Sequence, residues 1–217
     1  MKKIYSVEEI QKLEQKEFKR LKNSFILMKR AGINCAKKIH KIHPKKNIIV
    51  LCGPGNNGGD GLVISRILKN LKHGVTLYCL KSESYKGDAI KAYKLNKIIK
   101  NDLKNLKIDN KSIIIDCLFG IGLNRDITGT YKTLIKKINS SKQKIISIDI
   151  PSGVNGDTGE IMGIAVKADR TLILHAKKNG HVKNHGKKCS GKINVIDIGI
   201  KSGKNYFPLI HIKETFP

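Results

Sequence analysis

Acidic side chains follow three apolar runs of this sequence, each near the point where the run ends. Asp60 comes after the run that ends at Cys52, while Asp116 and Asp149 lie at the ends of two later runs. If these runs are parallel strands, their carboxyl ends meet at one edge of a sheet, where ligands bind. One such carboxylate commonly caps the following loop through backbone N–H groups. Three of them beside glycine-bearing loops favour a binding or catalytic site at that edge.

A glycine-rich stretch connects the first of these runs to a helical pattern that starts at Leu62. Gly53, Gly55 and Gly58 match the G-x-G-x-x-G pattern of dinucleotide-binding loops. Such a loop exposes backbone N–H groups beside the positive end of a helix dipole, which suits a phosphate group. The usual companion is an acid at the end of the second strand, but Glu83 lies beyond that strand. A tight turn that binds no ligand is therefore an alternative to the interpretation as a phosphate-binding loop.

Lysines and histidines gather after the fifth predicted strand. Lys177 and Lys178 lie at the same predicted edge of the sheet, although surface lysines are common in a chain with 43 lysine and arginine residues. His175, His181 and His185 lack the i, i+4 spacing of a helical zinc pair. We therefore interpret these histidines as surface or local packing residues.

Short apolar runs alternate with helical patterns along most of the chain. The predicted strands are residues 48–52, 75–80, 112–117, 144–149, 171–174 and 193–198. The predicted helices are residues 6–18, 24–39, 62–71, 88–99 and 130–138. This alternation predicts an α/β fold with a single doubly wound, mostly parallel sheet in a Rossmann-like three-layer αβα arrangement. We expect residues 1–217 to form one domain, because this length suits one α/β domain and is short for two.

The first two predicted helices precede the sheet and leave two interpretations open. Residues 6–9 have the form of a capping box at the start of the first helix. The second helix is densely apolar, and Ala31, Gly32 and Ala36 would allow a close approach to a neighbour. These helices either cover the sheet or form a contact between two copies of the chain.

Composition limits the classes of partner and compartment. The chain carries a formal net charge of +26, but its lysines are spread over the whole sequence without a zinc-finger, helix-turn-helix or RNP-type motif. We expect the charge to attract phosphorylated ligands, and we expect neither a nucleic-acid partner nor a membrane span. The five cysteines show no C-x-x-C spacing, and the N-terminus lacks the apolar core of a signal peptide. These features favour a cytoplasmic protein with reduced core cysteines.

Several segments resemble, in order along the chain, the motifs of one enzyme family, the NAD(P)H-hydrate epimerases. The segments are residues 28–32, 53–61, 116–125, 149–159, 165–169 and 178–180. The resemblance implies an isomerase that interconverts the R and S forms of hydrated NADH and NADPH (NADHX and NADPHX), a step in nicotinamide-nucleotide repair. It also implies a homodimer, and a separate NAD(P)HX dehydratase as the partner in the pathway.

The resemblance assigns roles to residues of the predicted sheet edge. Two loops would bind the substrate, with Asn56, Asn57, Gly58, Gly59 and Asp60 in the first and Gly120, Ile121, Gly122, Leu123, Asn124, Arg125 and Asp126 in the second. Asp149 would contact the substrate at its reacting end. A potassium ion would be held by Asn57, Asp116 and Ser152, whose oxygen atoms suit a hard cation.

Asp149 is the candidate acid–base group for the reaction. A carboxyl group at a buried strand end can have a raised pKa, so it can protonate a departing hydroxyl and accept a proton from returning water. Lys178 is a second candidate. The alternative is a non-catalytic dimeric module of the same fold that binds a nucleotide or a protein. An ordinary NAD-dependent dehydrogenase is disfavoured because the acid after the second strand is missing.

The sequence departs from the family pattern at a few positions. Lys29 and Arg30 stand where the family often has Glu-Asn, Ile121 stands in place of a threonine, and Asp126 stands in place of a proline. These changes concern the shape of the predicted pocket. Arg30 could also alter a contact to the substrate or to a second copy of the chain.

Overall fold

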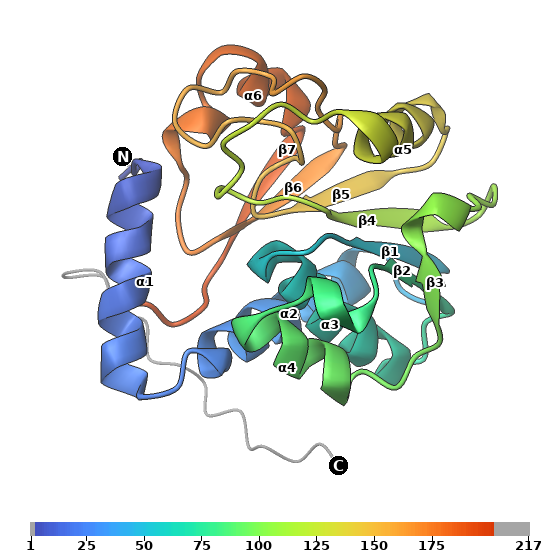
Figure 1. The fold of residues 1–217 in the computed structure, drawn as a ribbon, viewed down its shortest axis with the longest axis horizontal. Helices are drawn as coiled ribbons and strands as arrows, with labels where there is room; N and C mark the ends of the chain where they lie inside the picture. The colour runs from blue at the N-terminus through green and yellow to red at the C-terminus, as the bar shows by residue number, and fades with distance from the viewer. Residues whose placement is uncertain (1–2, 202–217) are drawn as a thin grey trace.

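The structure is a computed structural model that describes residues 3–201. A seven-stranded sheet runs through it in the order β3-β2-β1-β4-β5-β6-β7 (Figure 1), and every pairing is parallel. The strands are β1 Ile48–Cys52, β2 Val75–Cys79, β3 Lys100–Asp102, β4 Ile113–Cys117, β5 Ile145–Ile148, β6 Arg170–Leu174 and β7 Lys192–Ile196. The predicted doubly wound sheet is confirmed, while the predicted domain extends into residues 1–2 and 202–217, which lie outside the described residues.

Helices cover both faces of the sheet and complete the predicted three layers. The helices are α1 Val7–Leu21, α2 Phe25–Ile42, α3 Asn56–Asn70, α4 Gly87–Leu95, α5 Gly129–Ser140 and α6 Asn184–Cys189. Figure 1 shows α2, α3 and α4 on one face, α5 on the other, and α1 standing to one side of these layers. Short 3₁₀ turns, η1 Ser82–Ser84, η2 Leu103–Asn105 and η3 Asn179–His181, lie in the connections.

The apolar residues of β1 explain why helices lie on both sides of it. Ile48, Val50 and Cys52 belong to the core shared with α2, α3 and α4, while Ile49 and Leu51 belong to the core on the opposite face. Successive side chains of a strand point to opposite faces. A continuous apolar run is therefore what a parallel strand buried on both faces requires.

In the region after β2, the predicted end of one helix is wrong and one strand was not predicted. The predicted helix 88–99 ends at Leu95, because Asn96 adopts an extended conformation and its side-chain amide donates to Leu62 O at 2.8 Å and to Ser65 Oγ at 2.7 Å. β3 was not predicted because its sequence, Lys-Asn-Asp, has no apolar residue. As an edge strand it pairs only with β2, so it needs no buried face.

The glycine-rich stretch also differs from its prediction, because α3 begins at Asn56 rather than near Leu62. A side chain at Gly58 would place its Cβ 1.9 Å from the carbonyl oxygen of Gly53, so only glycine allows this approach. A Cβ at Gly61 would lie 2.7 Å from the sulfur of Cys52. The glycines therefore belong to the helix and let its first turns pack directly on the strand ends.

α2 packs on α3 and so covers one face of the sheet. A Cβ at Gly32 would lie 2.4 Å from Cγ1 of Val63, which shows how closely the two helices approach. The contact between two copies of the chain stays a prediction.

All five cysteines are buried and unpaired, as predicted. Within residues 3–201, no helix has both the length and the apolar character needed to cross a membrane.

Candidate functional site

A cavity of about 490 Å³ lies where the chain order of the sheet reverses, between β1 and β4. Its floor comes from the carboxyl ends of the strands: residues 54–57 after β1, residues 118–125 after β4, Asp149 after β5, and Leu174 at the end of β6. α1 and α2 supply further walls. This is the place where ligands bind in open parallel sheets, and the volume suits a small molecule.

The cavity brings together most of the residues predicted to bind substrate. Those that line it are Asn56, Asn57, Asp60, Gly120, Ile121, Gly122, Leu123, Asn124, Arg125 and Asp149. Gly58 and Gly59 do not line it, because their positions face Gly53 and Met28 within the packing around α3. Asp126 is exposed and also lies outside the lining.

The N-terminus of α3 faces this cavity. Gly55 is the N-cap and no side chain caps the helix, so the N–H groups of the first turn are not taken up by a capping oxygen. Asn56 and Asn57 of that turn line the cavity. The positive end of the helix dipole adds to these donors, so this wall suits a phosphate.

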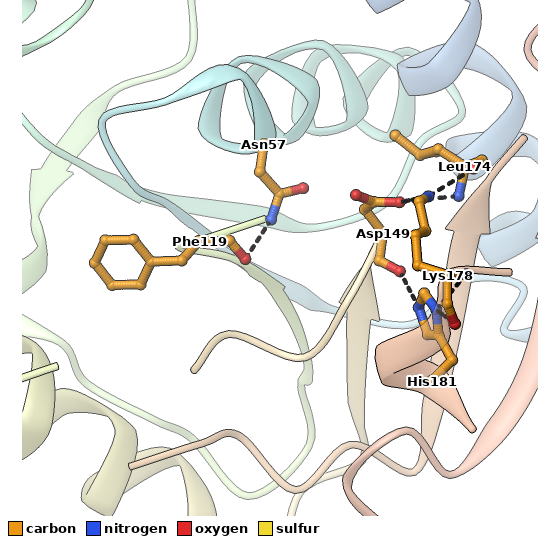
Figure 2. Close-up of polar contacts among 6 residues, drawn as sticks. All are labelled: Asn57, Phe119, Asp149, Leu174, Lys178 and His181. Carbon is orange, nitrogen blue, oxygen red and sulfur yellow. Dashed lines mark hydrogen bonds and ion pairs between the residues drawn. The ribbon is translucent and has the colours of Figure 1, made fainter. Parts of the chain in front are cut away.

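Asp149 is held in an unusual backbone conformation at the floor of the cavity. Its φ of 65° lies in the left-handed region, which a residue with a side chain adopts at a cost. Its N–H donates to Leu172 O at 2.8 Å, and its carboxylate forms an ion pair with Lys178 Nζ (Figure 2). Lys178 is 1% exposed, also donates to Leu174 O at 2.9 Å, and does not line the cavity itself.

His181 belongs to the same cluster, and its interpretation as a surface or local packing residue missed this role. It is fully buried, and its Nε2 lies 2.7 Å from the carbonyl oxygen of Asp149, which can only accept a hydrogen bond. Nε2 therefore carries the proton, and Nδ1 accepts from the N–H of Lys178 at 3.0 Å. Burial, and then the charge of Lys178, lower the pKa of His181, so the ring is neutral.

A second carboxyl group that the sequence analysis missed reaches the cavity from α1. Burial, and then the nearby charge of Asp149, raise the pKa of Glu14 to about 7, while Lys178 acts in the opposite direction. Burial likewise raises the pKa of Asp60 well above its usual range. Glu14 follows Ile10 by four residues and precedes Phe18 by four. A carboxyl group at this place on the apolar face of a helix was the available signal.

The residues predicted to hold potassium form one buried network around Phe119. Asn57 Nδ2 donates to Phe119 O at 3.0 Å (Figure 2), while the N–H of Phe119 donates to Ser152 Oγ at 2.9 Å. Ser152 Oγ in turn donates to Asp116 Oδ1 at 2.6 Å. The buried Oδ1 of Asn57 has no hydrogen-bond partner among the described residues. A free amide oxygen on a residue of a network that also contains hydroxyl and carbonyl oxygens fits a hard cation such as potassium.

Fold and site together define an α/β protein with a nucleotide-type loop and a carboxyl-lined cavity at the point where the strand order reverses. The sequence model of the family described as "YjeF-related protein N-terminus" matches residues 24–180. The NAD(P)H-hydrate epimerase of Lentilactobacillus buchneri is 36% identical over 216 residues, which cover 95% of this chain and 99% of that protein. The chain therefore belongs to the NAD(P)H-hydrate epimerase family, which confirms the resemblance of its motifs.

Other relatives extend this result. The NAD(P)H-hydrate epimerase of Levilactobacillus brevis is 40% identical over 158 residues, covering 70% of this chain and 73% of that protein. A bifunctional NAD(P)H-hydrate repair enzyme of Thermofilum pendens is 33% identical over 78% of this chain, which matches 35% of that longer protein. The crystal structure of a yeast protein shares the fold, with a TM-score of 0.73 at 21% identity over 95% of this chain and 90% of that one.

Proposed function

We propose that this protein is an NAD(P)H-hydrate epimerase that interconverts the R and S forms of NADHX and NADPHX. The observation that carries the proposal is the cavity itself, which joins the N-terminus of α3 to the carboxyl group of Asp149. The helix terminus suits the diphosphate of a dinucleotide, and the carboxyl group suits acid–base chemistry at its other end. The epimerases of the two lactobacilli support the same activity.

The chemistry at the hydrated carbon requires a proton to move in each direction. This carbon bears a hydroxyl group and a ring nitrogen, so departure of the hydroxyl leaves a cation that the nitrogen lone pair stabilises. Water can then return to either face of the ring. The negative Asp149 side chain stabilises that cation, and its carboxyl group is placed to exchange protons with the departing or returning water.

Lys178 and His181 position Asp149 rather than touch the substrate. The ion pair fixes the carboxylate, and the histidine fixes the backbone of the same residue through its carbonyl oxygen. Both are buried, so the orientation of Asp149 is set before substrate binds. Such preorganisation lowers the cost of reaching the transition state.

A potassium ion completes the proposed site. Asn57 Oδ1, Ser152 Oγ, a carboxylate oxygen of Asp116 and the carbonyl of Phe119 would hold it, and the free Asn57 Oδ1 supports this assignment. The ion would supply fixed positive charge beside the loop that faces the phosphates. We also propose a homodimer, a separate dehydratase as the pathway partner, and a cytoplasmic location. The unpaired buried cysteines support the cytoplasmic location, because thiols stay reduced in that compartment.

The experiment is to incubate purified protein with R-NADHX and follow the appearance of S-NADHX by chiral chromatography or NMR. We expect fast epimerisation in potassium chloride and slower epimerisation in sodium chloride of the same ionic strength. Asp149→Asn should abolish epimerisation but still bind ADP-ribose, because the amide keeps the shape and cannot exchange the proton. Binding of ADP-ribose by the wild-type protein without epimerisation would instead indicate the non-catalytic module.

A further inference from the structure

We propose that Glu14 of α1 is a second acid–base group of this cavity, working on the substrate together with Asp149. The proposal rests on the epimerase function and deepens it. Glu14 lies outside residues 24–180, the part of the chain that the family model matches. It nevertheless lines the cavity together with Gln11 and Phe18 of the same helix.

α1 is fixed against the site at its first turn. The N–H of Tyr5 donates to Lys177 O at 2.9 Å, and the N–H of Asn179 donates to Tyr5 O at 2.9 Å, so the chain before α1 pairs with the loop that carries Lys178. The N–H of Val7 then donates to Asp157 Oδ1 at 2.8 Å. The start of α1 is therefore tied to the segment that holds Lys178 against Asp149.

The other half of α1 is fixed by an ion pair with α2. The side chain of Glu17 is buried and pairs with Arg20 of its own helix and, at 3.8 Å, with Arg30 NH1 of α2. Ile10 is 1% exposed and anchors the same face of α1. Glu14 lies between these anchors, so its half-buried side chain is held on the wall of the cavity.

Glu14 differs from Asp149 in its surroundings. Asp149 has an ion-pair partner in Lys178, whereas Glu14 has none within residues 3–201. The charged groups that act on Glu14 are Asp149 and Lys178, and Glu14 in turn acts on Asp60. The remaining charged groups that line the cavity are Asp88 and Arg125. A pair of carboxyl groups in unlike surroundings can divide the roles of acid and base.

Epimerisation can use two carboxyl groups, because the hydroxyl leaves from one face of the ring and water returns to the other. In the first step the C–O bond breaks, its electron pair leaves with the oxygen, and one carboxyl group supplies the proton that completes a water molecule. The ring nitrogen lone pair forms the C=N bond. In the second step a water oxygen bonds to the opposite face, the C=N pair returns to nitrogen, and the second carboxylate takes the proton. Before the next turnover the first group regains a proton from solvent water and the second releases its proton to solvent, which restores both groups.

The test compares Glu14→Gln with Glu8→Gln, a matched control whose side chain is 73% exposed on the same helix. In the R-to-S epimerisation assay we expect Glu14→Gln to lower kcat by at least about 100-fold and to change KM by less than about threefold. Glu8→Gln should match the wild type. The pH profile of wild-type kcat/KM, which reports groups of the free enzyme, should show a step near pH 7, because burial raises the pKa of Glu14 to about 7, and the variant should lose that step.

Each other outcome has a distinct meaning. A wild-type protein without activity would defeat the epimerase function, whereas an active wild type with an unchanged Glu14→Gln variant would overturn the role of Glu14 alone. If Glu14→Gln fails to fold, NMR of wild-type protein labelled with ¹³C at glutamate carboxyl groups decides the matter. A glutamate titrating near pH 7 and perturbed by ADP-ribose supports the proposal, and its absence refutes it.

Discussion

At the scale of single residues, the site depends on side chains whose neighbours determine their chemistry. Asp149 adopts a left-handed backbone conformation with φ of 65°, and only its surroundings keep it there. Lys178 pairs with its carboxylate and His181 binds its carbonyl oxygen. The sequence placed Asp149 and Lys178 at the same edge, because both follow strands, but it could not show that they touch. His181 was missed because its partner is a backbone atom 32 residues away in sequence.

Lys178→Met tests the ion pair at this scale. The change leaves the Asp149 carboxylate at the cavity floor without its cation, and losing one member of a buried pair is costly. We expect the free energy of unfolding in urea to fall by about 3 kcal/mol. Lys177→Met is the control, because the adjacent lysine makes no ion pair within residues 3–201, and it should change stability by less than about 0.5 kcal/mol. Equal effects of the two changes would contradict the role given to Lys178.

At the scale of elements, the junction of β1 and α3 brings the helix terminus to the sheet edge. Gly53 N donates to Cys117 O at 3.0 Å, and a Cβ at Gly53 would lie 1.8 Å from Leu118 O, so this turn touches the end of β4 directly. The spacing of the glycines predicted a turn followed by a helix. It could not predict that α3 starts at Asn56, because glycine disfavours helices unless tertiary packing demands its small size.

Gly58→Ala and Gly55→Ala separate these roles within one motif. A Cβ at Gly58 would meet the Gly53 carbonyl oxygen at 1.9 Å, while at Gly55 nothing lies within 4 Å. We expect Gly58→Ala to lower the free energy of unfolding by at least about 2 kcal/mol, because backbone must move to admit the methyl group. Gly55→Ala should cost less than about 1 kcal/mol, the usual price of replacing an N-cap glycine with alanine. Urea denaturation of both variants measures the difference, and equal losses would show that the junction is looser than described.

At the scale of the whole molecule, the sequence predicted the order of the elements better than it predicted the contacts between elements far apart in the chain. The strands β1, β2, β4, β5, β6 and β7 were predicted because each has buried apolar residues, whereas the polar β3 was not. Of the three carboxyl groups expected at the sheet edge, Asp60 and Asp149 line the cavity, whereas Asp116 is fully buried and does not line it. Glu14 was missed because it lies far along the chain from the strand ends. Contacts of Tyr5, Asp157 and Arg30 place α1 across the sheet edge, and this brings Glu14 to the cavity.

The net charge of +26 belongs to the whole chain, and it should act on an anionic substrate before any contact forms. The screening length falls from about 30 Å at 0.01 M salt to about 8 Å at 0.15 M, so the attraction reaches beyond the cavity only at low ionic strength. We expect the KM for NADHX to rise about three- to tenfold between 0.02 and 0.3 M ionic strength, with kcat nearly unchanged. Steady-state epimerisation at constant potassium, with N-methylglucamine chloride as the added salt, measures both constants.

The split between the two constants decides where the charge acts. Lysines spread over the surface alter how readily the anionic dinucleotide arrives, and their positive charge cannot stabilise the cation formed at the hydrated carbon. A fall in kcat with a constant KM would therefore assign the salt effect to the buried groups around Asp149 instead. If neither KM nor kcat changes with ionic strength, the chain's charge is neutralised locally and does not attract the substrate.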